Sequence, residues 1–298
     1  MTIEAQLTDL GSGAAPPAPY EKKGRRLRAF LRNPTFVAGV AILGFFVLVS
    51  AFANLLFPAD PQDMAGTPLL WPGEDLEFPL GTDQLGRNVL AMLAYGARAS
   101  LLVGVSSAAI GLAIGMVVGA AAGFFGGWVD TFLMRLVELF QTTPTFLLVI
   151  VIVAISEPSL PTIAMAIGLA AWPTVARLVR AQFRSLRESD FVMAARSLGY
   201  SRLRIIVQEI LPNALPPIIV AASVMIANAI LTEAGLSFLN MRDPNVVSWG
   251  GMIGDGREQL RNAWFLTALP GAAIAMAVLS LNLVGDGLNE ILNPRNEP

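Results

Sequence analysis

Residues 100–124 read SLLVGVSSAAIGLAIGMVVGAAAGF, a continuous apolar run without a charged side chain. An α-helix needs about 20 residues to cross a hydrocarbon core roughly 30 Å thick, so this run is long enough to span a membrane. Further apolar runs lie on both sides of it, at about 36–57, 131–155, 160–179, 205–231 and 265–283. None of them alternates in period two, and this continuity favours helices over barrel strands.

The composition supports the same class. Of the 298 residues, 54% are hydrophobic and only 14% are charged, with a mean hydropathy of +0.61. In lipid, an α-helix satisfies all its backbone hydrogen bonds within one segment. We therefore predict an all-α polytopic membrane protein with six transmembrane helices. The alternative, buried helices of a soluble protein, would leave too little polar surface to dissolve the chain.

The runs divide the chain into segments. We expect a cytoplasmic N-terminal tail at 1–35, a first transmembrane helix at 36–57 and an external segment at 58–99. A core domain at 100–291, with a cytoplasmic loop at about 183–211, and a cytoplasmic C-terminal tail at 292–298 complete the division. The tract Lys22 to Arg32 before an apolar run also imitates a signal peptide, with Ala51-Phe52-Ala53 as a cleavage site. We favour an uncleaved anchor because the apolar run is longer than a signal core.

The positions of Lys and Arg predict the orientation, because positive charge is retained on the cytoplasmic side. One group precedes the first span: Lys22, Lys23, Arg25, Arg26, Arg28 and Arg32. A second group lies between the fourth and fifth spans or at their edges: Arg177, Arg180, Arg184, Arg187, Arg196, Arg202 and Arg204. Together with Arg295, these residues place both termini in the cytoplasm.

Several kinds of chemistry are excluded. The chain contains no Cys and no His, so disulfides, thiolate or imidazole metal sites and Cys or His nucleophiles cannot occur. Its only lysines, Lys22 and Lys23, end no G-x-x-x-x-G-K-[ST] loop, so it has no P-loop for a nucleotide. We expect no catalytic, metal or cofactor site in this chain, and a pump built on it would need a separate ATPase.

Few charged residues fall inside the spans. Arg135 and Glu138 are three residues apart on the third span and are expected to pair. Glu233, at the outer end of the fifth span, and Asp286, at the inner end of the sixth, are expected to be solvated. No carboxylate is predicted at mid-membrane, and this disfavours a carrier coupled to protons or sodium.

Two segments are predicted to lie outside. Residues 58–97 are rich in Pro and Gly, and Thr82 or Asp83 is expected to cap a short helix that runs along the outer face toward Tyr95 and Arg98. Residues 236–264 place Trp249 beside two glycines. This segment could pack on a partner or help to receive a cargo molecule, and we favour packing because an aromatic residue next to glycines suits a close helix contact.

Residues 189–212, SDFVMAARSLGYSRLRIIVQEILP, form a polar, arginine-rich island between apolar runs. The pattern predicts a helix, a turn and a second helix on the cytoplasmic side. Ala194 and Ala195 permit close approach of another surface, Gly199 allows a sharp reversal, and Pro212 is expected to bend the chain into the fifth span. The alternative is an ordinary solvated loop.

This island resembles the cytoplasmic loop of bacterial ABC importer permeases, which reads Glu-Ala-Ala, three residues, Gly, nine residues, Ile, one residue, Leu-Pro. The matching positions are Ala194, Ala195, Gly199, Leu211 and Pro212. Met193 and Glu209 depart from the pattern, at its Glu and its Ile. More narrowly, the stretches 80–104, 232–240, 248–257 and 270–295 resemble the second permease of the dipeptide, oligopeptide and nickel importers.

The resemblance implies a type I ABC importer membrane domain in the bacterial inner membrane. Its partners would be a homologous second permease, two ATPase subunits that hold ATP and Mg, an external substrate-binding protein and membrane lipid, with no nucleic acid. The five matching positions would seat in an ATPase subunit and couple it to transport. The chain would form half of the translocation pathway.

Peptide is the expected cargo, with nickel chelates, oligosaccharides and opine-like compounds as alternatives. A secondary carrier or channel acting without an ATPase is the alternative function. A third possibility is a membrane anchor for a cytoplasmic enzyme. A carrier would show ion-dependent uptake, whereas an anchor would bind its partner without any substrate flux.

Overall fold

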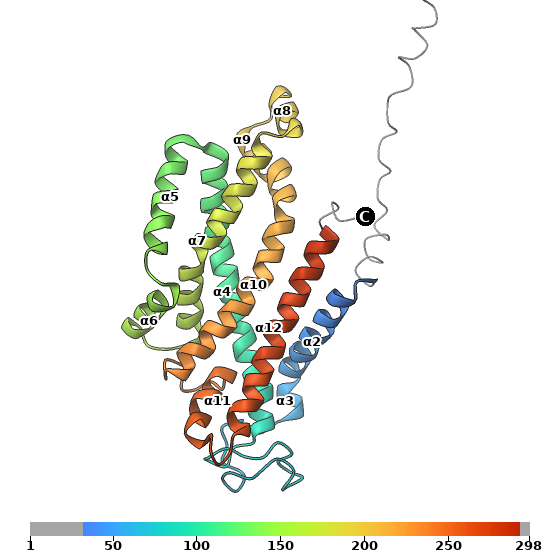
Figure 1. Cartoon of the computed structure of the whole chain (residues 1–298), viewed down its shortest axis with the longest axis vertical. Coiled ribbons are helices and arrows are strands. Elements are labelled where there is room, and N and C mark those ends of the chain that lie inside the picture. Colours follow the sequence, from blue (N-terminus) through green and yellow to red (C-terminus); the bar gives the residue numbers. More distant parts are fainter. Residues whose placement is uncertain (1–31, 293–298) are drawn as a thin grey trace, which may run out of the picture.

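The structure, a computed structural model, describes residues 32–292 and consists of helices joined by turns and loops (Figure 1). Its elements are α2 (Pro34–Ala51), α3 (Ala53–Leu56), α4 (Val89–Phe125), α5 (Gly127–Gln141), α6 (Thr145–Ile155), α7 (Leu160–Arg187), α8 (Asp190–Ser197), α9 (Arg202–Arg204), η2 (Ile205–Ile210), α10 (Leu211–Phe238), α11 (Trp249–Gly256), η3 (Arg257–Gln259) and α12 (Phe265–Leu292). Most of the predicted N-terminal tail, with Lys22 to Arg28, lies outside the described residues, as does Arg295.

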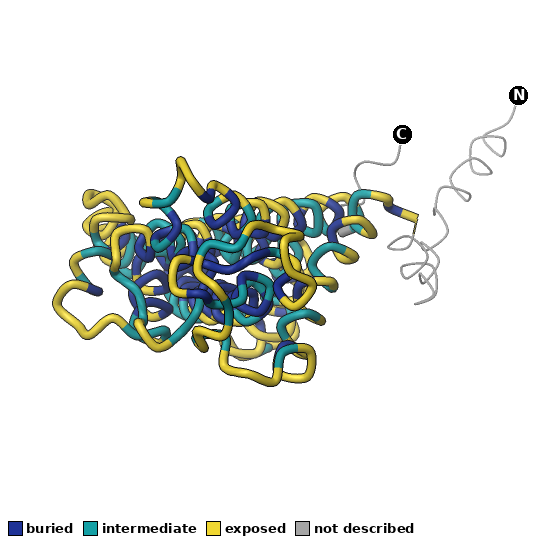
Figure 2. Tube along the Cα trace, turned by 90° about the horizontal axis from the view of Figure 1, so that it is seen from below, coloured by how far each residue is buried: buried dark blue, intermediate teal, exposed yellow. Residues whose placement is uncertain are grey.

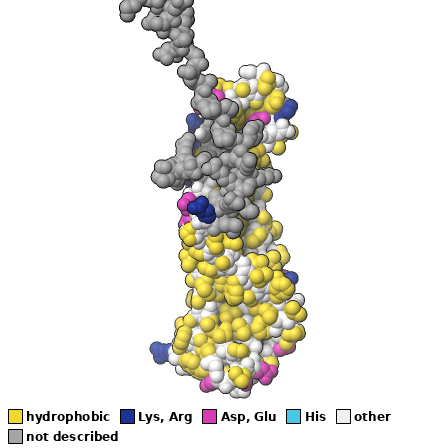
Figure 3. Space-filling model, turned by 90° about the vertical axis from the view of Figure 1, so that its right-hand side faces the viewer, with side chains coloured by type: hydrophobic (Ala, Val, Ile, Leu, Met, Phe, Trp, Pro, Cys, Tyr) yellow, Lys and Arg dark blue, Asp and Glu magenta, His cyan; other side chains and the backbone are white. Residues whose placement is uncertain are grey.

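The described part contains five helices long and apolar enough to cross a membrane. They are α2, α4, α7, the continuous stretch Arg202–Phe238 and α12. Exposed side chains on the face shown in Figure 3 are largely hydrophobic, above all over its lower half, where the few acidic ones lie at the bottom. This surface suits a bundle surrounded by lipid, and the predicted all-α membrane fold is confirmed.

The third predicted span, 131–155, is bent rather than straight, and it is a sixth span if its two helices are taken as one unit. It is split into α5 and α6, which meet at an angle of 79°. Pro144 stands at the break, where it has no N–H for a helical hydrogen bond and disfavours helical geometry at Thr143. With 11 residues, α6 is only about 16 Å long, so the pair crosses a membrane only as a bent unit.

The centre of the bundle is the close packing of α4 on α7. Gly111, Gly115, Gly119 and Gly123 recur every four residues on the α4 face that meets α7. A Cβ placed at Gly115 would lie 2.5 Å from the Cβ of Val175, and one at Gly123 would lie 2.7 Å from the carbonyl oxygen of Arg180. Small residues in this spacing let two helix backbones approach closely.

The remaining helices pack around this pair. α10 contacts α4, α7, α11 and α12, and α2 lies beside α12 at the edge of the bundle (Figure 1). Buried positions gather in the interior, with exposed ones around it (Figure 2). The two ends of the bundle differ: α8 and α9 project from one end, whereas α11 and residues 57–88 cover the other.

The predicted short helix along the outer face is wrong. α4 starts at Val89, because Asn88 caps it by accepting hydrogen bonds from the backbone N–H groups of Leu90 and Ala91. It then continues for 37 residues, so no separate short helix precedes the span. Asp83 instead binds Arg87, with 2.6 Å between Oδ2 and Nε. The Thr82 hydroxyl donates to the carbonyl of Thr67 at 2.5 Å and accepts from Leu70 N–H, so it stabilises the turns before α4.

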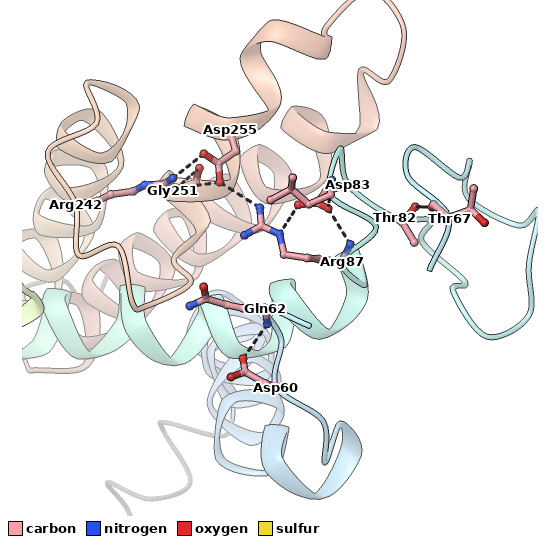
Figure 4. A network of polar contacts seen from close by, with 10 residues as sticks. Asp60, Gln62, Thr67, Thr82, Asp83, Arg87, Arg242, Gly251 and Asp255 are labelled. Atoms are coloured by element: carbon pink, nitrogen blue, oxygen red, sulfur yellow. Dashed lines mark hydrogen bonds and ion pairs between the residues drawn. The ribbon is translucent and has the colours of Figure 1, made fainter. Parts of the chain in front are cut away.

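An ion-pair chain fastens these turns to the helix α11 (Figure 4). Arg87 pairs with both Asp83 and Asp255, and Asp255 also binds Arg242, with 2.6 Å between Oδ1 and Nη2. Arg242 additionally donates to the carbonyl of Gly251 at 2.9 Å. The turns before α4, the helix α11 and the loop after α10 therefore form one connected unit.

Candidate functional site

The polar island folds as predicted into a helix, a turn and a second helix. α8 packs inward through Val192 and Ala195, which lie in one apolar cluster with Phe183 of α7 and Ile205. Other apolar side chains of the island point outward and are exposed: Phe191, Met193, Leu198 and Leu203. Leu198 at the turn is 73% exposed. The island is thus anchored to the bundle and presents an apolar tip.

Gly199 makes the reversal after α8. Its φ is +80°, in the left-handed region that residues with a side chain rarely adopt. Gly199 N–H donates to the carbonyl of Arg196 at 2.9 Å, and Tyr200 N–H donates to that of Ala195 at 3.1 Å. These two bonds define a Schellman motif. Ala195 is buried beneath the turn, whereas Ala194 lies on its exposed side.

Leu211 and Pro212 do not bend the chain sharply. α9, η2 and α10 form one continuous helix from Arg202 to Phe238, in which Ile205–Ile210 is π-helical. Leu211 N–H donates to the carbonyl of Ile206, five residues back. Pro212 follows directly and has no N–H to continue the ordinary pattern, which accounts for the wider turn. The island therefore leads into a membrane helix without a flexible joint.

A charged contact secures the bundle near α8. Two guanidinium nitrogens of Arg180 on α7, Nε and Nη2, donate to the carboxylate of Asp130 on α5, at 2.5 and 2.6 Å. Arg187 also donates to the carbonyl of Phe124 at 3.1 Å. The predicted pair of Arg135 and Glu138 is present at 3.0 Å, but both side chains are largely exposed.

We expect Asp130→Asn to weaken the attachment of α5 to α7 and to lower the midpoint of thermal unfolding in detergent. The Arg180 guanidinium loses its charged partner, a change of about 1–3 kcal/mol in the free energy of unfolding. Glu138→Gln breaks the exposed pair on the same helix and should change it by less than about 0.5 kcal/mol. Equal unfolding midpoints for the two variants would contradict this assignment.

A cavity of about 450 Å³ opens between α4, α6, α7 and α10. Its polar lining consists of hydroxyl and amide side chains: Ser107, Thr145, Thr174, Asn228 and Thr232. The rest is apolar and includes Phe146, Val149 and Met225. Among the described residues that line the cavity, none is charged. The cavity therefore offers neutral hydrogen-bonding groups in an apolar wall, and sequence reasoning identified none of them.

The prediction for Glu233, at the α11 end, is wrong. Glu233 is not solvated: it is only 2% exposed and accepts hydrogen bonds from serine side chains. Trp249 is 1% exposed and packs within its own chain, where its ring N–H donates to the carbonyl of Leu93 and its ring meets Phe46 edge-on. The close contact expected around Trp249 is therefore made within its own chain, and a role of residues 236–264 toward a partner or cargo stays a prediction.

The helical bundle, with a short helix pair projecting from one end and a cavity among its long helices, is similar to solved transporter subunits. It matches a chain of the inward-facing MetNI methionine ABC transporter with a TM-score of 0.57 and 18% identity. The match covers 68% of this chain and 96% of the other. The protein thus has the fold of a type I ABC importer membrane subunit.

Sequence comparisons place the chain more narrowly. Residues 111–298 match the family described as binding-protein-dependent transport system inner membrane component, and residues 24–72 match the N-terminal transmembrane domain of oligopeptide transport permease C. The chain belongs to this family of importer permeases, which confirms the resemblance drawn from its motifs.

Curated relatives extend over nearly the whole chain. The di/tripeptide transport system permease protein DppC of Pseudomonas aeruginosa is 37% identical, over 90% of each chain. The dipeptide transport system permease protein DppC of Alkalihalophilus pseudofirmus is 36% identical, over 93% of this chain and 90% of the relative. A putative peptide transport system permease protein of Brucella abortus is 38% identical, over 99% and 98%.

Proposed function

We propose that this chain is the permease subunit of an ATP-driven importer of di- or oligopeptides and forms half of its translocation pathway. The observation that carries the proposal is the mechanical continuity of α8 with the cavity. α8 and its Gly199 turn lead into the continuous helix 202–238, and Asn228 and Thr232 on that helix line the cavity. A partner that moves α8 would therefore move the cavity wall.

The proposed partners follow from the family. A homologous permease would complete the pathway, and two ATPases would bind ATP and Mg, so hydrolysis occurs outside this chain. An external binding protein would deliver the cargo. The arginine-rich α8 end is assigned to the cytoplasm by its positive charge, and both termini with it. The five coupling positions, from Ala194 to Pro212, are assigned to the contact with an ATPase.

Peptide cargo is supported by the names of the relatives and by the chemistry of the cavity. Peptides share a backbone whose N–H and C=O groups can bind hydroxyls and amides, while their side chains vary. A wall of Ser, Thr and Asn without charged residues suits such a substrate, since it can pass different side chains without repelling either charge. Selection would then reside mainly in the binding protein.

Uptake by the reconstituted complex tests this function. Proteoliposomes that contain this chain with its co-purified permease and ATPases should accumulate a labelled dipeptide only with internal ATP and loaded binding protein. A nickel chelate, an oligosaccharide and an opine serve as competing cargoes. If this chain alone supports uptake driven by an ion gradient, the proposed importer function is wrong and the chain is a secondary carrier.

Asn228 provides a prediction about the cavity. It carries the only amide side chain among the cavity-lining residues described, and Leu231 lies three residues further on the same helix. We expect Asn228→Leu to reduce peptide uptake about tenfold, the effect of one lost hydrogen bond to the cargo, with normal assembly. Leu231→Val, which keeps the wall apolar, should leave uptake within about twofold. Unchanged uptake by Asn228→Leu would exclude its contact with cargo.

A further inference from the structure

A buried carboxylate lies at the junction of three helices, close to the α11 end of the bundle. Glu233 belongs to α10, and its side chain reaches Ser100 of α4 and Ser248, the N-cap of α11. Ser237, one turn further along α10, binds the same carboxylate. Ionisable groups in a membrane helix are costly to bury, so such a residue calls for a functional explanation.

The serines link this carboxylate to the first turn of α11. The Ser248 hydroxyl accepts from Gly251 N–H at 3.1 Å and donates to Glu233 Oε1 at 2.7 Å. The Ser100 hydroxyl accepts from Trp249 N–H at 3.3 Å and donates to Glu233 Oε2 at 3.4 Å. Two of the backbone N–H groups left unpaired at the start of α11 are thus connected through hydroxyls to one carboxylate.

This arrangement exceeds what is needed to cap a helix. A serine side chain alone satisfies an N-terminal N–H group. Within residues 32–292, no Arg side chain forms an ion pair with Glu233, and the nearby Arg242 is bound to Asp255 and Gly251. The Glu233 carboxylate accepts hydrogen bonds from the hydroxyls of Ser100, Ser237 and Ser248 and lies near the positive end of the α11 dipole. Two of these three serines, Ser100 and Ser248, also bind backbone N–H groups of α11, so the carboxylate helps to fix the position of α11.

The opposite side of the same α10 segment forms the wall of the cavity. Asn228 and Thr232 line the cavity, whereas the next residue, Glu233, faces α4 and α11. Gly250 of α11 lies against Ala234, where an added Cβ would come within 2.5 Å of the Ala234 Cα. Because the two helices are in such close contact, a movement of α11 would displace α10.

Residues that follow α11 offer a surface on which such a movement could begin. Leu260 and Trp264 are both more than half exposed, beside the exposed Glu258. This end carries no part of the arginine-rich island and is external under the proposed orientation. A binding protein that docks here would press on the loop joining α11 to α12.

We propose that Glu233 is a positioning residue that ties α11 to the cavity wall, so that docking of the loaded binding protein is transmitted to Asn228 and Thr232. The proposal rests on the importer function given above. It assigns the external binding protein a mechanical effect on this chain, through α11, in addition to delivery of cargo.

Glu233→Gln tests the role of the charge with little change in shape. The amide keeps an oxygen for Ser237 and Ser248, but its NH2 group cannot accept the Ser100 proton. In proteoliposomes of the whole complex, we expect basal ATP hydrolysis within about twofold of wild type. Stimulation by saturating loaded binding protein should fall about tenfold, as expected for loss of one hydrogen bond to a charged group. The concentration that gives half-maximal stimulation should stay unchanged, because docking itself is intact.

Other outcomes would overturn the proposal. They are stimulation within twofold of wild type, or basal and stimulated rates that fall in parallel, the pattern of a merely structural defect. If Glu233→Gln does not assemble, Ser248→Ala removes one link and should show the same selective loss, to a smaller degree; normal stimulation there would equally contradict the proposal. Glu138→Gln, which changes an exposed carboxylate of α5 away from α11 and from the proposed docking surface, is the control and should behave as wild type. Failure of wild-type uptake would refute the importer function instead.

Discussion

Replacement of Gly119 by leucine is expected to prevent this protein from folding in the membrane. A Cβ at Gly119 would meet the carbonyl oxygen of Ala176 closer than any van der Waals contact allows, and would lie 2.7 Å from the Cβ of Val179. Both obstacles belong to α7, and one is backbone that cannot rotate away. The two central helices must therefore separate, at a cost of about 3 kcal/mol or more.

The measurement is the amount of monodisperse protein recovered in mild detergent. We expect Gly119→Leu to yield about a tenth of the wild-type amount or less, because such a loss of stability increases degradation in the cell. Gly44→Leu is the matched control: Gly44 lies in α2, and a Cβ there would have nothing within 4 Å. Equal recovery of the two variants would show that α4 and α7 do not pack as described.

The second large effect is expected at the turn after α8. Gly199→Val should abolish the coupling of ATP hydrolysis to uptake while the bundle stays folded. A β-branched residue is strongly disfavoured at a φ of +80°, so the Schellman motif opens and the apolar tip moves. We expect uptake to fall by about tenfold or more, with ATP hydrolysis by the complex no longer dependent on cargo.

Two variants separate this role from backbone strain. Gly73→Val introduces a β-branched residue at a similar φ of +85°, with open space around it, at the opposite end of the molecule. It should leave coupling intact. Gly199→Asn should retain most of the coupling, because Asn tolerates the left-handed region. If Gly199→Val transports normally, the turn has no part in coupling.

Much of the fold could be predicted because lipid imposes a simple requirement. Each membrane helix must be long and apolar, and 100–124 or 265–283 satisfy this rule on their own. The break between α5 and α6 was missed because 131–155 is apolar on average, although the polar residues 141–145, with Pro144 among them, marked the position. The α4–α7 contact was also missed, even though the glycines at 111, 115, 119 and 123 give its spacing directly.

The sites were predictable to different degrees. The turn at Gly199 depends on local backbone chemistry, so its form could be read from residues 189–212. The cavity and the surroundings of Glu233 depend on which helix faces are brought together, and a single sequence does not contain that information. Glu233 lies near the end of a span, where solvation is the usual outcome, but α11 folds back and covers it.

Site-directed crosslinking most directly tests the claim that α8 is the contact with an ATPase. Because the chain contains no cysteine, a single Leu198→Cys substitution marks the exposed tip of the turn without background. Leu76→Cys marks the α11 end, where Leu76 is 97% exposed. In native membranes treated with a short thiol-to-amine crosslinker, Leu198→Cys should give a product that contains a P-loop ATPase, and Leu76→Cys should not. An ATPase product from Leu76→Cys alone, or none from either position, would contradict the account.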